Sequence, residues 1–230
     1  MTGRIVFGLS AVLYAVVTLM WHGSDMWEHL RWMPAPASTI AAWCLAIAQI
    51  VGGIGILLPR TTRTASVVLG GVYLIFSLQN VPGMFAAPTN PVLYINFFEQ
   101  FSIVCGAIVL FAQTDVPLAR LALGLCAFSF AWAQVVYFQF TAGLVPKWIP
   151  PNQAFWTILT TIAFALAGIA MLVNVRARLA TRLMALMIAL FGVLVWVPHI
   201  AAQPAALANW SEFGLNFLIA GAAWLVADGE

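Results

Sequence analysis

Eight apolar runs alternate with short polar segments along the chain. A membrane-spanning helix needs roughly 20 mostly apolar residues, because no water is present in the hydrocarbon core to bond its backbone groups. The runs that reach or approach this length cover residues 5–21, 39–58, 65–85, 96–112, 118–140, 154–175, 183–198 and 212–227. This pattern predicts an all-α membrane protein of about eight transmembrane helices.

The two halves of the chain share residues at matching positions. A shift of 116 positions brings Arg31-Trp32-Met33-Pro34 onto Lys147-Trp148-Ile149-Pro150. It also superposes Gly8 on Gly124, Gly52 on Gly168, Arg60 on Arg176 and Val81-Pro82 on Val197-Pro198. A deletion of three residues in the following loop then aligns Asn96-x-x-Glu99 with Asn209-x-x-Glu212. We therefore predict two parallel four-helix repeats, residues 1–115 and 116–230, related by an axis along the membrane normal.

Charged residues are rare and unevenly distributed. They make up 7% of the chain, whereas an ordinary soluble domain is about 25% charged. With the N-terminus inside, the cytoplasmic segments hold Arg4, Arg60, Arg63, Arg120, Arg176, Arg178 and Arg182, and the other side holds only Arg31 and Lys147. Basic residues concentrate on the cytoplasmic side of membrane proteins. Both termini are therefore expected in the cytoplasm, and the first run is kept as a helix because no small-x-small cleavage site follows it.

Several classes of ligand are not favoured by the sequence. The net charge of +2 comes without a Lys/Arg cluster, so we expect the lipid bilayer and no nucleic acid as a partner. The three histidines offer no mid-membrane pair for haem, and no glycine loop has the spacing of a phosphate-binding motif. Cys44, Cys105 and Cys126 lie in apolar runs and are expected to be small buried side chains.

The second half carries the most distinctive motifs. These are Phe140-Thr141-Ala142-Gly143-Leu144-Val145-Pro146-Lys147-Trp148-Ile149-Pro150-Pro151, a helix around Gly168, a basic turn over 176–182, and Pro198-His199. In these motifs the chain resembles the DoxX-like family of small four-helix bacterial membrane proteins, and it looks like a duplicated or fused member. The resemblance implies the bacterial cytoplasmic (inner) membrane and, as for some members, an association with quinone-linked or thiol-linked redox complexes. It carries over no catalytic residues.

Two acids, Glu99 and Glu212, fall at matching places near the outer ends of their predicted helices. An ionised carboxylate at the bilayer centre costs about 2.5 to 3.5 kcal/mol, so such a pair is a candidate cation site or proton relay. The alternative is local, because Asn96 and Asn209 each precede the acid by three residues, which is the spacing of a capping box at a helix start.

Other polar residues are also expected in the outer half of the bundle. Asn80, Gln139 and His199, together with Gln79, Gln100 and Asn216, indicate either an outward-facing polar cavity or a set of interhelical hydrogen bonds. Hydrogen bonds of the second kind are worth about 0.6 to 2 kcal/mol each. A single histidine that follows Pro198 at a helix end is also typical of an interfacial position.

The first outer loop holds a candidate metal site. On a helix, His22, Asp25 and His29 would share one face, and two imidazoles with a carboxylate are suitable ligands for zinc or another divalent metal. Gly23 argues against a well-formed helix there, so an amphipathic interfacial turn is the alternative interpretation.

Three functions follow as hypotheses. The resemblance and the lack of a self-contained redox site favour a non-catalytic or accessory subunit of a membrane redox system that exchanges with the quinone pool. The repeat and the paired acids favour a transporter of a small solute, ion or proton with an outward-facing polar site. The loop histidines favour a metal-dependent membrane enzyme, which elemental analysis of gently purified protein would test.

Overall fold

The computed structural model describes residues 2–20, 34 and 37–229. Within these ranges all regular structure is helical. The helices of the first half are α1 (Thr2–Met20), α3 (Ala37–Leu57), α4 (Thr62–Leu78), α5 (Val81–Ala86) and α6 (Pro91–Ala112). Those of the second half are α7 (Pro117–Val136), α8 (Phe138–Leu144), α9 (Gln153–Val173), α10 (Ala177–Phe191), the π-helix η1 (Gly192–Trp196), α11 (Val197–Ala202) and α12 (Leu207–Gly229).

Eight helical segments in the described ranges are long and apolar enough to cross a membrane. Six of them are the single helices α1, α3, α6, α7, α9 and α12, and the other two combine α4 with α5 and α10 with η1 and α11. Large apolar side chains such as Leu9, Ile40, Val67 and Leu166 are exposed on their outer faces, where lipid rather than water is the natural solvent. The expected all-α membrane-protein class is confirmed.

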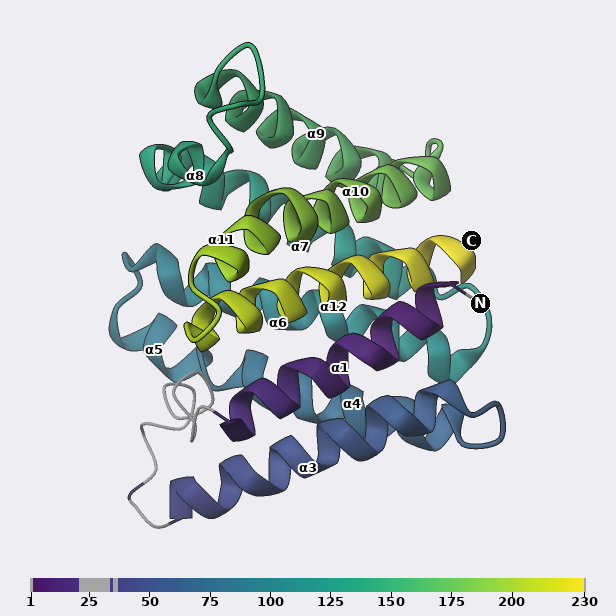
Figure 1. Cartoon of the computed structure of the whole chain (residues 1–230). Helices are drawn as coiled ribbons and strands as arrows, with labels where there is room; N and C mark the ends of the chain where they lie inside the picture. The colour runs from purple at the N-terminus through teal and green to yellow at the C-terminus, as the bar shows by residue number, and fades with distance from the viewer. Residues whose placement is uncertain (1, 21–33, 35–36, 230) are drawn as a thin grey trace.

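The central helices of the bundle are α6 and α12, which pack against each other (Figure 1). Helix α12 also packs on α1 and α10, and α6 also packs on α4 and α7. The pairs α3–α4 and α9–α10 lie on opposite flanks (Figure 1). The tandem repeat itself stays a prediction, but each half follows the same order of neighbours from its first long helix to its last.

Small residues allow the helices to approach closely. A Cβ atom added to Gly53 on α3 would lie 2.7 Å from the carbonyl oxygen of Gly8 on α1. At the central crossing, a Cβ atom on Gly106 of α6 would lie 2.6 Å from the Cα atom of Ala222 on α12. Any larger side chain at these points would push the backbones apart, so glycine sets the distance between the helices.

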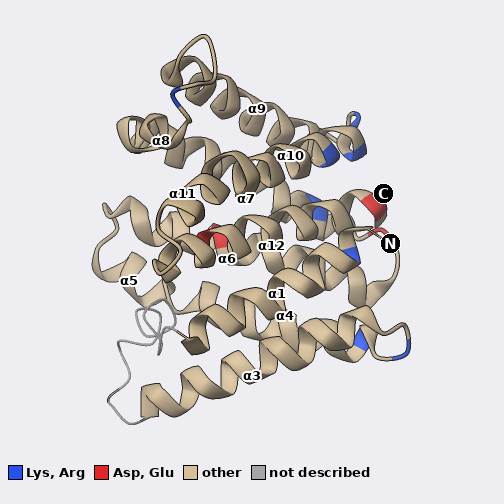
Figure 2. Cartoon of the chain, viewed as in Figure 1, with Lys and Arg blue, Asp and Glu red and all other residues tan. Residues whose placement is uncertain are grey.

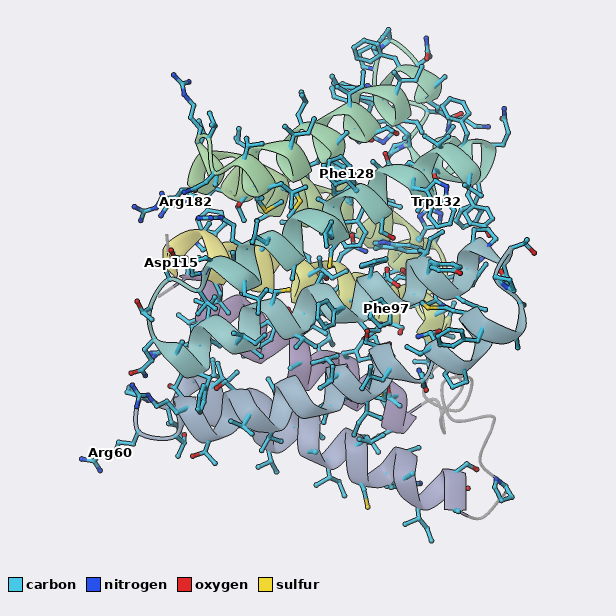
Figure 3. All side chains as sticks on the ribbon, turned by 180° about the vertical axis from the view of Figure 1, so that it is seen from behind. Arg60, Phe97, Asp115, Phe128, Trp132 and Arg182 are labelled. Atoms are coloured by element: carbon cyan, nitrogen blue, oxygen red, sulfur yellow. The ribbon has the colours of Figure 1, made fainter. Side chains whose placement is uncertain are left out.

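Basic residues gather at one end of the bundle, beside both termini (Figure 2). We call it the arginine end, and it comprises Arg4, Arg60, Arg63, Arg120, Arg176, Arg178 and Arg182. Figure 3 shows Arg60, Asp115 and Arg182 there, and Trp132 toward the opposite end. Arg182 forms an ion pair with Asp228 at 2.9 Å. Lys147 lies in the loop between α8 and α9, at the opposite end.

Candidate functional site

A cavity of about 280 Å³ lies in the second half, at the end opposite the arginines. Its walls come from α7, the α8 region, the start of α9, the α10–η1 junction and the start of α12. Most of the lining is apolar and includes Leu144, Val145, Pro146, Ile149, Phe191, Leu194 and Val195. The polar lining residues are Gln134, Thr141, Thr157, Thr160, Glu212 and Asn216. An apolar hollow with a few polar groups is the usual form of a small-molecule site.

Gln134 on α7 is a polar group of the cavity that is hydrogen-bonded to a neighbouring helix. Its side chain is 8% exposed, and its Oε1 atom accepts hydrogen bonds from the hydroxyls of Thr160 at 3.1 Å and Thr161 at 2.8 Å. Both threonines lie on α9, so the amide is held across the α7–α9 contact. The Nε2 atom of Gln134 has no hydrogen-bond partner among the described residues. This atom is therefore the one that is able to donate a hydrogen bond to a ligand.

Glu212 and Asn216 lie one turn apart on α12 and both line the cavity. The Asn216 amide nitrogen donates to the backbone carbonyl of Glu212 at 2.9 Å, which fixes the asparagine against its own helix. The Glu212 side chain is partly buried. The cavity therefore combines an amide donor on α7 with a carboxyl group on α12, and a carboxyl group is able to exchange a proton.

Two tryptophans complete the cavity. The indole nitrogen of Trp156 donates to the carbonyl of Pro150 at 2.8 Å, and the ring of Trp196 lies 5.7 Å from that of His199. Tryptophan commonly sits where one end of its ring is apolar and the other is polar. Both tryptophans line the cavity.

One side of the cavity is formed where the α10 helix widens into the π-helix η1. Leu194, Val195 and Trp196 of η1 all line the cavity. Just beyond it, Pro198 has no amide hydrogen and cannot continue the regular hydrogen-bond ladder. The Nδ1 atom of His199 lies 2.7 Å from the carbonyl oxygen of Val195, one turn earlier in the same segment. Single π-turns inside α-helices often occur at functional sites.

The other predicted polar residues lie elsewhere. Asn80 is buried in the turn between α4 and α5, and its amide donates to the carbonyls of Phe76 at 3.0 Å and Ser77 at 3.2 Å on α4. Gln139 on α8 and His199 on α11 are exposed and do not line the cavity. Glu99 lies partly buried on α6, outside the cavity lining. Of the predicted outer polar residues, Glu212 and Asn216 line the cavity.

The expected capping roles of Asn96 and Asn209 are wrong. Helix α6 begins at Pro91, and the side chain of Asn90 caps it by accepting from the Val92 amide at 3.1 Å. Asn96 therefore lies inside the helix. Asn209 is the third residue of α12, and its amide donates to the carbonyl of His199 at 3.2 Å. For α6 the reason is that Asn90 followed by Pro91 is the stronger start signal, since proline needs no amide partner in the first turn.

The candidate metal ligands His22, Asp25 and His29 lie outside the described residues. Within the described part of the chain, no group of three or more His, Cys, Asp and Glu side chains is placed to hold a metal ion. The metal site therefore stays a prediction. Among the cysteines, Cys105 and Cys126 are buried as expected, whereas Cys44 is exposed on the outer face of α3.

Little in the sequence marks Gln134 as a site residue. It lies inside the apolar run 118–140, and only the threonines at 157, 160 and 161 supply a polar stripe at helical spacing on the neighbouring helix. No protein-family model, curated protein or solved structure matches the chain. The DoxX-like resemblance therefore rests on the sequence motifs alone.

Proposed function

We propose that this integral membrane protein is an accessory subunit of a quinone-linked redox system in the bacterial cytoplasmic membrane. In this proposal the cavity holds the head group of a quinone, and a partner protein supplies the electrons. The arginine end faces the cytoplasm, because basic residues favour that side. The observation that carries the proposal is the apolar cavity with the Gln134 amide nitrogen available in its wall.

The chemistry of the cavity suits a quinone ring. A quinone carries two carbonyl oxygens that accept hydrogen bonds, on a flat apolar ring with an apolar tail. Gln134 offers a donor for one carbonyl, and Trp156 and Trp196 offer apolar faces for the ring. A volume of about 280 Å³ accommodates a single ring rather than a large polar solute.

Glu212 is the proton-exchanging group of this proposal. Reduction of a quinone to a quinol takes up two electrons and two protons. The electrons come from the redox partner, and a carboxyl group in the cavity wall is placed to pass protons between the ligand and the adjacent aqueous side. The chain itself needs no redox centre for this role.

Quinone titration of the purified full-length protein in mild detergent tests the proposal. Decylubiquinone should quench the tryptophan fluorescence with a saturable dependence, because Trp156 and Trp196 line the cavity. Gln134→Leu removes one hydrogen bond worth about 1 kcal/mol, so the Kd should rise about fivefold. Gln139→Leu is the matched control, since this glutamine is exposed on α8, and it should leave the Kd unchanged.

Two outcomes would count against quinone binding. One is quenching that rises linearly with decylubiquinone and never saturates, which indicates partition into the detergent. The other is an equal loss of affinity in the Gln134 and Gln139 variants, which would mean that the amide in the cavity has no special role.

A proton-coupled or ion transporter is the second candidate, favoured by the Glu212 side chain in the cavity. Glu99 occupies the related place on α6, and α6 packs directly on α12. This function predicts that Glu99→Gln and Glu212→Gln both abolish uptake or a pH response in proteoliposomes. The redox-subunit proposal predicts instead that only Glu212→Gln affects quinone exchange, because Glu99 lies outside the cavity lining.

A further inference from the structure

A second hollow, of about 360 Å³, lies between α9 and α10 on the flank of the bundle. We call it the α9–α10 groove. Its walls are apolar side chains of α9, among them Ala163, Leu166 and Ala170, and of α10, among them Leu179, Leu183 and Met187. Leu166, Leu179 and Leu183 are all about half exposed or more, so the groove faces the lipid.

Arg176 closes the groove at the arginine end. It lies in the turn between α9 and α10 in a left-handed backbone conformation, with φ of 50°. Arg176 lines the groove, and its side chain has no hydrogen bond or ion pair with any described residue. Arg182, by contrast, is paired with Asp228 at 2.9 Å. The positive charge of Arg176 is therefore available to a negatively charged group outside the protein.

The length of the groove matches one leaflet of a bilayer. From Arg176 to Met187 the chain advances eleven positions, which at about 1.5 Å per residue gives a length of about 16 Å. Half of the hydrocarbon core is about 15 Å thick. An acyl chain whose head group sits at Arg176 would therefore fill the groove and end near the middle of the membrane.

The corresponding contact in the first half is tightly packed. A Cβ atom on Gly52 of α3 would lie 2.8 Å from the Leu69 side chain, and one on Gly55 would lie 2.9 Å from Cβ of Ala65. In the second half, Gly168 of α9 faces α7 instead, where its added Cβ would meet the ring of Phe128 at 2.9 Å (Figure 3). No glycine thus brings α9 against α10 in the way that Gly52 and Gly55 bring α3 against α4.

We propose that the α9–α10 groove is a binding site for an acidic phospholipid. One acyl chain lies between α9 and α10, and Arg176 binds the phosphate of the head group. Acidic lipids are preferred because their net negative charge is not cancelled by a cation in the same head group. A basic residue at the membrane surface contributes enough attraction for a preference of about fivefold over a zwitterionic lipid. This site is separate from the proposed quinone cavity.

Native mass spectrometry of the full-length protein tests the site, with dioleoylphosphatidylglycerol or dioleoylphosphatidylcholine added to the detergent. The wild-type protein should retain phosphatidylglycerol with about fivefold higher affinity. Arg176→Gln should remove this preference. Ala170→Phe fills the groove beside the arginine and should reduce retention of both lipids. Arg60→Gln is the matched control, because Arg60 lies in the equivalent turn beside the closed α3–α4 contact, and it should behave as the wild type.

Either of two results would overturn the proposal. Equal retention of the two lipids by the wild-type protein would show that the groove holds only ordinary boundary lipid. Equal loss of the preference in Arg60→Gln and Arg176→Gln would show that it comes from general surface charge rather than from the groove. Should Arg176→Gln fail to fold, wild-type retention by Ala170→Phe would contradict the site by itself.

Discussion

At the scale of single residues, most polar side chains inside the helices bond within their own helix. The Thr18 and Thr181 hydroxyls each donate at 2.9 Å to the carbonyl four residues earlier. Gln49 and Gln134 bond across helices instead. Tyr73 on α4 donates to Gln49 on α3 at 2.9 Å in the fully buried core. Gln134 also accepts across helices but borders a cavity, and this difference makes it a ligand-binding candidate.

Helix capping offers a direct test at this scale. The side chain of Asn152 accepts from the Phe155 amide at 2.8 Å at the start of α9, so Asn152→Ala should lower the unfolding free energy by about 1 kcal/mol. Asn96→Ala should lower the unfolding free energy by less, because Asn96 lies inside α6 and does not cap it. Denaturant unfolding in detergent micelles compares the two variants. A larger loss in Asn96→Ala would restore the capping-box interpretation.

At the scale of elements, the positions of the long helices could be predicted from the apolar runs, but the starts of some of them could not. Helix α6 was expected from residue 96 and begins at Pro91, and α10 was expected from 183 and begins at Ala177. Helix α10 extends back through Arg178 and Arg182, basic residues that end an apolar run without ending the helix, whereas α6 extends back to the start signal of Asn90 and Pro91. The π-helix was not visible in the sequence, apart from the proline that follows it.

The central crossing of α6 and α12 is the most sensitive contact between elements. Gly106→Ala would place a methyl group 2.6 Å from the Ala222 backbone, so the helices must separate, and stability should fall by about 1 to 3 kcal/mol. Gly71 on α4 is the control, because an added Cβ there meets no atom within 4 Å. Gly71→Ala should be neutral or gain up to about 1 kcal/mol.

Thermal unfolding of both glycine variants in the same detergent gives the comparison. Equal melting temperatures for the Gly106 and Gly71 variants would mean that the α6–α12 crossing is looser than the structure shows.

At the scale of the whole molecule, the chain places both termini at the arginine end (Figure 2). We predict that this end faces the cytoplasm. A fluorescent protein fused to the C-terminus should therefore fluoresce, since it folds only in the cytoplasm. Alkaline phosphatase fused after Asn152, in the turn beyond Lys147, should be active because that turn lies outside. A dark fluorescent-protein fusion together with an inactive alkaline-phosphatase fusion would indicate the reverse orientation.

The overall class of the molecule was predictable because lipid restricts the choice of structure to helices or barrels, and the apolar runs have helical length. The cavity was not predictable in the same way. It depends on contacts between α7, α9 and α12, which bring Gln134, Thr160 and Glu212 together from positions far apart in the sequence. The paired acids show why the sequence alone does not predict the cavity. Glu99 and Glu212 match in sequence, but of the two only Glu212 lines the cavity.

The redox-subunit proposal is tested most directly by purification from native membranes in mild detergent, followed by mass spectrometry of every retained protein and quinone. The proposal predicts a stoichiometric quinone together with a redox protein, and less retained quinone in Gln134→Leu. A preparation that is free of both quinone and redox partner, yet folded and thermally stable, would contradict it.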